Sequence, residues 1–352
     1  MNKNGKFVTF GEIMLRLRSP EHYRLFQTPE LEATFGGGEA NVAVSLSILG
    51  RDACFVTSLP NNAVGEACKN EVIKYGVDTS KINMTEGRLG IYYLESGANQ
   101  RPSLVVYDRA ESCIAKAPAD AYDWKGIFAD ASWFHISGIT PAVSQNAADA
   151  SLAAMKAAKA NGVTVSIDLN FRKKLWKYGK DAPEVMRELT KYVDVVIANE
   201  EDIQKCLGIS MADAGAKEND VTKAEIDADA YEKLTAEVKK QFPNVKIVAV
   251  TLRESISADH NGWSACISGT TGFYVSRHYD ITDIIDRVGG GDSFSAGLIF
   301  GLSEYGTDEE SAINFAAASS CLKHSISGDF NLSRKSEVLS LMGGDGSGRV
   351  QR

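Results

Sequence analysis

The stretch DRVGGGDSFSAG, residues 286–297, decides how the rest of this chain is interpreted. The apolar residues that follow its glycines are spaced for one face of a helix over residues 293–305. A helix N-terminus leaves backbone N–H groups without partners, and glycine lets an anion come close to them. The helix dipole also favours negative charge at that end. The stretch therefore predicts an anion hole, suited to a phosphoryl group, at Gly289, Gly290 and Gly291.

Asp292 follows these glycines directly, so its carboxylate would repel an anion bound there. The local residues leave two interpretations open. Aspartate is a good helix N-cap. It is also a suitable general base, which would take a proton from a hydroxyl group that attacks the phosphoryl group.

A second glycine-rich stretch, FGGGEANVA, covers residues 35–43 and leads into a helix expected over 41–50. Neither stretch has the spacing Gly-x-x-x-x-Gly-Lys-Ser/Thr, which excludes a P-loop NTPase. Neither has the position of a dinucleotide fingerprint, which follows the first strand and precedes an acidic residue by about 20 positions. A dinucleotide-dependent oxidoreductase is therefore the least supported class of enzyme.

Strand-like and helix-like patterns alternate in the second part of the chain. This order predicts parallel strands with crossover helices, an α/β fold. The strands are almost wholly apolar, as expected when helices cover both faces of the sheet. Strands are expected over residues 132–138, 163–170, 193–199 and 245–252. Helices are expected over residues 144–162, 182–191, 200–207 and 293–305.

The first 120 or so residues read differently. Residues 7–18 begin as a core strand and then alternate in polarity, and residues 92–96 and 103–109 suggest antiparallel strands. We expect a small β-sheet lid from about 13–35 and 88–112, inserted into a single domain over 1–342. A small sheet with one uncovered face would close over a cleft or pair with another subunit, giving a homo-oligomer. The tail 343–352 has the composition of a disordered end, and a polar insertion at 210–230 has no readable role.

Composition narrows the possible partners. The net charge of −8 over 352 residues argues against nucleic acid. The start, MNKNGKFVTFGEI, is not a signal peptide, and no apolar run approaches the roughly 18 residues of a membrane span, so we expect no membrane partner. The six cysteines are scattered without a Cys-x-x-Cys pair, which indicates reduced thiols in a cytoplasmic protein.

Both glycine-rich stretches resemble signatures of the ribokinase-like (PfkB) family of carbohydrate kinases. GGGEANVAVSLSILG resembles the first signature, and RVGGGDSFSAGLIFGL resembles the second, in which Gly-x-Gly-Asp carries the anion hole and the base. Within the family, SLVVYDR, SIDLNFRKKLW and HISGITPAVS resemble the 2-keto-3-deoxygluconate kinases. The resemblance implies a ribokinase-like fold, a mainly parallel sheet between helices with a β lid. It also implies phosphorylation of the terminal 6-hydroxyl of 2-keto-3-deoxygluconate, with Asp292 as catalytic base and Gly289, Gly290 and Gly291 as anion hole.

The resemblance assigns further roles residue by residue. It implies contacts with the sugar acid at Gly37, Gly38, Asn41, Tyr92, Tyr107, Arg109 and Arg172, together with Asp292. It implies contacts with the nucleotide at Asn170, Arg172, Thr251, Arg253, Gly289, Gly291, Asn314, Ala317 and Cys321. It implies contacts with Mg²⁺ through water at Asn199 and Asp202, with Asp168 supporting the same region. Two arginines in the cleft suit an acidic sugar, because the guanidinium group donates two parallel hydrogen bonds to a carboxylate.

Simpler interpretations stay open for several of these residues. Asp202 stands where the family has glutamate and could serve only as an acidic helix start, with Glu200 or Glu201 taking its place at the metal. The segment TLRESISADHNGW lacks the glycine of the family's ATP-lining loop, which leaves the nucleotide preference open. Ordinary helix packing would explain Asn314, Ala317 and Cys321 equally well.

The cofactors implied by the resemblance are ATP and Mg²⁺, and the family also allows a monovalent cation such as K⁺. Two alternative functions remain. One is another sugar kinase of the family, such as a fructokinase. The other is a non-catalytic sensor that binds a sugar acid on a kinase scaffold.

Overall fold

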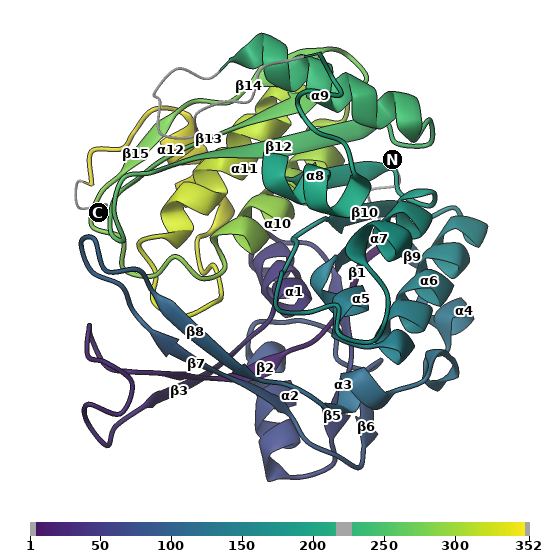
Figure 1. The fold of residues 1–352 in the computed structure, drawn as a ribbon, viewed down its shortest axis with the longest axis vertical. Coiled ribbons are helices and arrows are strands. Elements are labelled where there is room, and N and C mark those ends of the chain that lie inside the picture. Colours follow the sequence, from purple (N-terminus) through teal and green to yellow (C-terminus); the bar gives the residue numbers. More distant parts are fainter. Residues whose placement is uncertain (1–4, 216–226, 349–352) are drawn as a thin grey trace.

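The computed structural model describes residues 5–215 and 227–348 of the chain. Its centre is a nine-stranded sheet in the order β14-β13-β12-β11-β10-β9-β1-β4, in which β15 also pairs with β13 (Figure 1). The strands are β1 (Lys6–Phe10), β4 (Ala53–Val56), β9 (Ala131–Ser137), β10 (Thr164–Asp168), β11 (Val195–Ala198), β12 (Ile247–Ser255), β13 (Asn261–Ser268), β14 (Phe273–Val275) and β15 (Tyr279–Ile281).

Pairing in this sheet is parallel from β4 to β12 and antiparallel where β13, β14 and β15 are added. The α/β fold with a mainly parallel sheet is thereby confirmed. Strand β12 is longer than the predicted 245–252, because its pairing with β13 continues to the pair Ser255–Asn261.

Alternate residues of the central strands face two separate cores. In β11, Val196 and Ala198 belong to one core, and Val195 and Ile197 belong to the other. The first core contains residues of α3 (Cys113–Lys116), α4 (Trp124–Ile127), α6 (Gln145–Ala160), α7 (Ala182–Thr190), α8 (Glu200–Leu207) and α9 (Ala228–Gln241). The second contains residues of α1 (Gly38–Ile48), α2 (Ala63–Lys74), α10 (Gly290–Tyr305), α11 (Glu309–Lys323) and α12 (Lys335–Met342). Because both faces are covered by helices, the strands are apolar on both sides.

The long helix expected over 144–162 is α6, with the short α5 (Ile139–Val143) before it. Ser144 caps α6, since its Oγ accepts a hydrogen bond from the Ala147 N–H at 3.1 Å. The helix ends ahead of Gly162, whose φ of 72° lies in the left-handed region that glycine adopts without strain. Both ends of α6 are therefore set by the residues that predicted them.

Helix α10 differs from its prediction in its start and in its burial. It begins at Gly290 because Gly289, with φ 83°, serves as its N-cap. Instead of one apolar face, the helix is buried on all sides from Ser293 to Ser303. The cause lies in two glycines that face α11. A Cβ on Gly297 or Gly301 would lie only 2.8–2.9 Å from the Cα atom of an alanine in that helix.

A separate four-stranded sheet in the order β3-β2-β7-β8 stands to one side of the main sheet, at the lower left of Figure 1. Its strands are β2 (Met14–Arg18), β3 (Glu32–Gly36), β7 (Gly90–Glu95) and β8 (Leu104–Asp108). They fall in or beside the two segments predicted to form a lid, and we call this sheet the lid. Strands β7 and β8 are antiparallel, as predicted. A two-stranded sheet, β5 (Ser58–Pro60) with β6 (Asn83–Thr85), lies near its base.

The last helix, α12, ends at Met342, where the predicted domain ends. The final part of the predicted tail, 349–352, lies outside the described residues, as does 216–226 of the polar insertion. Over 5–215 and 227–348, no helix is long and apolar enough to cross a membrane.

Candidate active site

A cavity of about 620 Å³ lies between the lid and the carboxyl ends of the parallel strands. Its wall contains Glu12 after β1, Ile139 after β9, Asp168 and Asn170 at the end of β10, and Asn199 after β11. This edge is where open α/β sheets bind ligands, because the loops that follow successive strands converge there. All the predicted site residues line this cavity except three on α11, which are Asn314, Ala317 and Cys321.

The three glycines at the start of α10 differ in what a side chain at each position would meet. Gly289 has φ 83°, and a Cβ on it would lie 2.1 Å from the carbonyl oxygen of Asp329. A Cβ on Gly290 would lie 3.0 Å from the ring of His324. A Cβ on Gly291 would meet nothing within 4 Å, so that residue faces open space.

The first intrahelical hydrogen bond of α10 is donated by the Ser293 N–H to the Gly289 carbonyl at 2.8 Å. The N–H groups of Gly291 and Asp292 come before it and therefore have no acceptor one helical turn back. Both residues line the cavity. The helix thus presents unpaired donors and the positive end of its dipole where an anion could enter.

Asp292 is not the N-cap of α10, because that position belongs to Gly289. Its Oδ2 instead accepts a hydrogen bond from the Asn41 side chain of α1 at 2.7 Å. Burial raises the pKa of Asp292 to about 7, against the effect of the Asn41 hydrogen bond and with the help of the nearby Asp329 carboxylate. A carboxylate with this pKa is poised to accept a proton near neutral pH.

Arg109, directly after lid strand β8, forms contacts that restrict its role. Arg109 is buried, and its guanidinium group pairs with Glu12, to which its Nε donates at 2.7 Å. Glu12 also accepts a hydrogen bond from the Ser112 hydroxyl at 2.6 Å. Tyr92 is buried beside them, whereas Tyr107 is 40% exposed. Arg109 is thus committed to a carboxylate of the chain, which the sequence argument for two free arginines did not foresee.

Asn199 and Asp202 form a reciprocal capping box at the start of α8. The Asp202 N–H donates to the Asn199 side chain at 2.8 Å, and Asp202 Oδ1 accepts from the Phe171 N–H at 2.9 Å. Burial raises the pKa of Asp202 to about 6. Asp202 does stand at an acidic helix start, and in addition it forms a capping box that was not predicted from the sequence. Its hydrogen bond from the Phe171 N–H holds the loop that carries Arg172.

Asp168, at the end of β10, is buried near other carboxylates. Burial raises the pKa of Asp168 well above its usual value, and the charges of Asp202 and Asp292 raise it further. The Ser295 hydroxyl donates to it at 3.3 Å. These acids line one part of the cavity wall.

Three arginines gather in another part of the wall. Burial and the charge of Arg172 lower the pKa of Arg253, and burial and the charge of Arg253 lower the pKa of Arg287. Arg253 is therefore close enough to Arg172 and to Arg287 to be repelled by each, which favours a polyanion at this part of the wall. Arg287 was missed by the sequence argument, although it stands two residues before the glycines.

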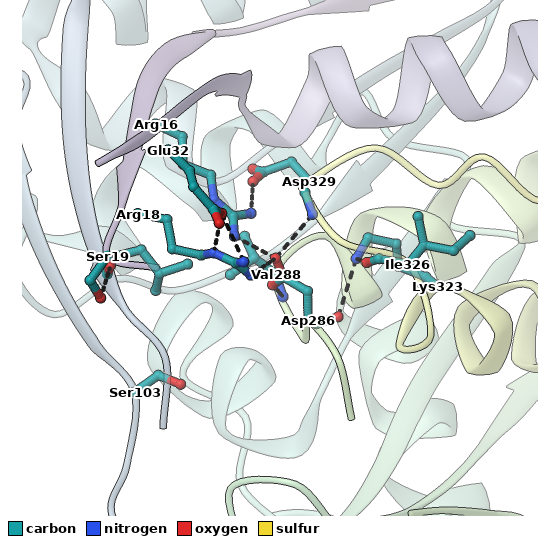
Figure 2. Close-up of polar contacts among 12 residues, drawn as sticks. Arg16, Arg18, Ser19, Glu32, Ser103, Asp286, Val288, Lys323, Ile326 and Asp329 are labelled. Atoms are coloured by element: carbon teal, nitrogen blue, oxygen red, sulfur yellow. Dashed lines mark hydrogen bonds and ion pairs between the residues drawn. The ribbon is translucent and has the colours of Figure 1, made fainter. Parts of the chain in front are cut away.

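A buried ionic network, also missed, joins the lid to the loops around α10. Arg16 of β2 is fully buried, donates to Asp329 at 2.6 Å and also pairs with Asp286 (Figure 2). The Tyr92 hydroxyl donates to the same Asp329 carboxylate at 2.6 Å. Nothing in the stretch MLRLR indicates that Arg16 is buried, and the distant Asp286 and Asp329 explain its burial.

The three predicted nucleotide residues on α11 lie apart from the cavity wall. Ala317 is fully buried, and the Asn314 side chain binds the backbone of Arg277 at 2.9 Å and of Glu310 at 2.9 Å. Cys321 is partly exposed. Their contact with a nucleotide stays a prediction.

Comparisons with known proteins agree on one family. The family model described as pfkB family carbohydrate kinase matches residues 4–332. A crystal structure of 2-dehydro-3-deoxygluconokinase from Thermotoga maritima matches with a TM-score of 0.89 and 47% identity, covering 97% of this chain and 100% of that one. The 2-dehydro-3-deoxygalactonokinase of Haloferax volcanii is 32% identical over 97% of this chain and 98% of its own length. The 2-dehydro-3-deoxygluconokinase of Bacillus subtilis is 26% identical over 92% of this chain and 91% of its own length.

Proposed function

This chain belongs to the pfkB family of carbohydrate kinases, and from that premise we propose that it transfers phosphate from ATP to the terminal 6-hydroxyl of 2-dehydro-3-deoxy-D-gluconate. The transfer of phosphate to an alcohol is the activity of the family. The choice of this sugar acid rests on the relatives and on the cavity together.

One observation carries the proposal. Asp292, held by Asn41, stands in the same cavity as the unpaired N–H groups at the start of α10. A base for the hydroxyl and donors for the transferring phosphoryl group are thereby brought within one site. Proteins catalyse phosphoryl transfer mainly by such positioning of the reacting groups and by stabilising the developing charge.

In the proposed mechanism, the substrate hydroxyl lies against Asp292 and loses its proton to Oδ1 as the oxygen attacks the γ-phosphorus. The bond from that phosphorus to the β,γ-bridging oxygen breaks, and ADP leaves. The N–H groups of Gly291 and Asp292 would stabilise the phosphoryl oxygens. Arg172 and Arg253 would bind the phosphates or the substrate carboxylate, since arginine suits both anions.

Kinases of this family use ATP and Mg²⁺. In the described ranges, no group of three or more His, Cys, Asp or Glu side chains could hold a metal ion. The Asp202 carboxylate accepts backbone N–H groups, which leaves it suited to contact through water. The residues therefore fit Mg²⁺ that is bound mainly by nucleotide phosphates and water, where it would neutralise charge on the phosphates.

The substrate assignment is tested by measuring ADP release with a panel of neutral and acidic sugars. We expect kcat/KM for 2-dehydro-3-deoxygluconate to exceed that for fructose by at least about 100-fold, the discrimination that one lost charged contact supports. A preference for fructose would refute the sugar-acid assignment in favour of a fructokinase. ATP binding without turnover of any sugar would favour a sensor instead.

We also propose that the lid mediates a homo-oligomer. Leu17, Tyr93 and Val106 lie in register across three neighbouring lid strands, and Val106 is 45% exposed. Leu104, on the same face of β8, is also 45% exposed. Light scattering during gel filtration would test this, because Val106→Asp should convert a wild-type dimer into a monomer. A monomeric wild-type protein at about 100 µM would contradict it.

A cytoplasmic location is proposed on a separate ground. All six cysteines are free, and five are buried, as expected for a protein of a reducing compartment. Localisation of a fluorescently tagged chain would test it, and secretion would contradict it.

A further inference from the structure

Lys323, the last residue of α11, is fully buried, and its ammonium group binds two backbone carbonyl groups. Its Nζ donates to the Asp286 carbonyl at 3.2 Å and to the Ile326 carbonyl at 3.0 Å. Figure 2 shows this side chain between the loop that leads to α10 and the loop that follows α11. Lys323 does not line the cavity.

The two loops that Lys323 joins support the glycines of the anion hole from behind. Asp286 begins the stretch DRVGGGD, and its carboxylate accepts the N–H groups of Val288 at 3.0 Å and Gly328 at 3.1 Å. The second loop places the Asp329 carbonyl against Gly289, where it excludes any Cβ. The position of the anion hole therefore depends on how these loops are held together.

A buried ammonium group is costly unless charges and hydrogen bonds compensate for lost water. Burial lowers the pKa of Lys323, while the charges of Asp286 and Asp329 oppose that shift. An ammonium group bound by carbonyl oxygens has the same charge and ligand type as K⁺ in carbonyl sites. A monovalent cation does not fit between the Asp286 and Ile326 carbonyl groups, because the lysine nitrogen occupies that position.

We propose that Lys323 is a positioning residue whose ammonium group takes the place of a bound monovalent cation. From that place it holds the loop that carries the anion hole in position. Phosphoryl transfer by this chain should then be independent of K⁺. The proposal rests on the kinase activity, and it has a structural consequence that can be measured without any substrate.

Two variants and a matched control test it. Lys323→Met removes the charge and leaves an unbranched side chain only one atom shorter, and Lys323→Ala leaves room for a small cation. Lys239→Met is the control, because the Lys239 ammonium also donates to a carbonyl group, that of Gly269 at 2.7 Å, away from the cavity. Wild-type kcat is measured in KCl and in tetramethylammonium chloride at equal ionic strength.

We expect the wild-type kcat to be equal in the two salts. For Lys323→Met we expect kcat to fall about 100-fold with a nearly unchanged KM, because a small misplacement of reacting groups has that effect. Methylammonium or K⁺ should restore part of the activity of Lys323→Ala. Activation of the wild type by K⁺, or normal turnover by a folded Lys323→Met, would overturn the proposal.

Hydrogen exchange separates this proposal from the function itself. In Lys323→Met, peptides covering 284–292 and 325–330 should exchange faster than in the wild type, and in Lys239→Met they should not. Unchanged exchange in Lys323→Met would overturn the proposal even if no sugar were a substrate. If Lys323→Met fails to fold, the wild-type comparison of the two salts still decides whether K⁺ is needed.

Discussion

At the scale of single residues, the proposed base Asp292 owes its raised pKa to where the fold places it. The residue is half-buried at the start of α10, near Asp329, and accepts a hydrogen bond from Asn41 of α1 at 2.7 Å. Burial raises the pKa of Asp292 to about 7, so a proton taken from a hydroxyl group is retained more readily than on an exposed aspartate. The same burial makes its charge unfavourable for folding.

The first prediction concerns the pH dependence of activity. A base works only when it is deprotonated, and the pKa of Asp292 is raised to about 7. Thus kcat/KM should rise about tenfold per pH unit below pH 7 and level off above it. Steady-state assays from pH 5 to 9 would measure this. A profile that is flat down to pH 5 would mean that the base has an ordinary carboxyl pKa.

The second prediction concerns Asp292→Asn. Because the folded-state pKa of Asp292 is raised, protonation of this carboxylate stabilises the native state at low pH. This stabilisation is lost as the pH rises from about 4 to 7. At pH 8 the free energy of unfolding of the variant should exceed that of the wild type by on the order of 1 kcal/mol. Its turnover should fall by about 10³-fold or more. Urea titrations at pH 8 and pH 4 check the sign. Greater stabilisation of the variant at pH 4 than at pH 8 would contradict it.

At the scale of elements, α10 combines close packing at its middle with open space at its start. Gly301 allows α11 to approach, since a Cβ there would lie 2.8 Å from a Cα atom of α11. Gly291 faces the cavity and has nothing within 4 Å of such a Cβ. Gly301 thus allows two helices to pack closely, whereas Gly291 leaves space in the cavity. Substituting each glycine in turn distinguishes the two effects.

The third prediction is that Gly291→Ala keeps the fold and loses activity. Alanine has the better helix propensity by up to about 1 kcal/mol, so thermal stability should not fall. The added methyl group enters the space for the phosphoryl group, and kcat should fall about 100-fold. Gly301→Ala is the control, with the reverse expectation of lower stability by about 1–3 kcal/mol. Wild-type turnover by Gly291→Ala would show that the phosphoryl group lies elsewhere.

The fourth prediction concerns the lid, which is tied to the body by Arg16. Its guanidinium group is buried between Asp286 and Asp329, and removing it leaves two buried carboxylates without their main partner. Arg16→Met should lower the free energy of unfolding by about 3 kcal/mol or more. Arg24→Met, which removes an exposed arginine paired with Glu95 at 3.0 Å, should cost about 1 kcal/mol or less. Equal denaturation midpoints for the two variants would contradict the assignment.

The sequence predicted elements whose signals are local. The apolar strands β9 to β12, the cap of α6 by Ser144 and the glycines before α10 are each readable within a few residues. The sequence could not predict contacts between distant segments. Arg16 and Asp329 are 313 residues apart, and nothing near either indicates the other. The burial of α10 on all sides likewise depended on glycines that face α11.

The same limit applies to the candidate site. Residues that share a motif, such as Asp292 with its glycines, were found together, and the structure brings Asn41 to them. Arg109 was predicted to lie in the cleft, but nothing in the sequence shows that the Arg109 guanidinium pairs with Glu12, which lies 97 positions away. Two interpretations of Asp202 were left open, a contact with the metal through water and an acidic helix start, and the capping box that it forms with Asn199 is a local contact.

At the scale of the whole molecule, the lid and the main sheet enclose one cavity between them. The lid supplies Tyr92 and Tyr107, the strand ends supply Asp168 and Asn170, and the start of α10 forms part of the wall. The arrangement allows a sugar to be held between lid and sheet while phosphates lie against the arginines and the start of α10. Under the proposed function, substrate choice would depend on the shape of this enclosed space and on the arginines in its wall.

The most direct test gives the wild-type enzyme ATP, Mg²⁺ and an equal mixture of 2-dehydro-3-deoxygluconate and fructose, and examines the product by ¹H–³¹P correlation NMR. We predict a single phosphate ester, coupled to the two C6 protons of the sugar acid, with fructose left unchanged. Phosphate on fructose, or on another oxygen of the sugar acid, would contradict the proposed function.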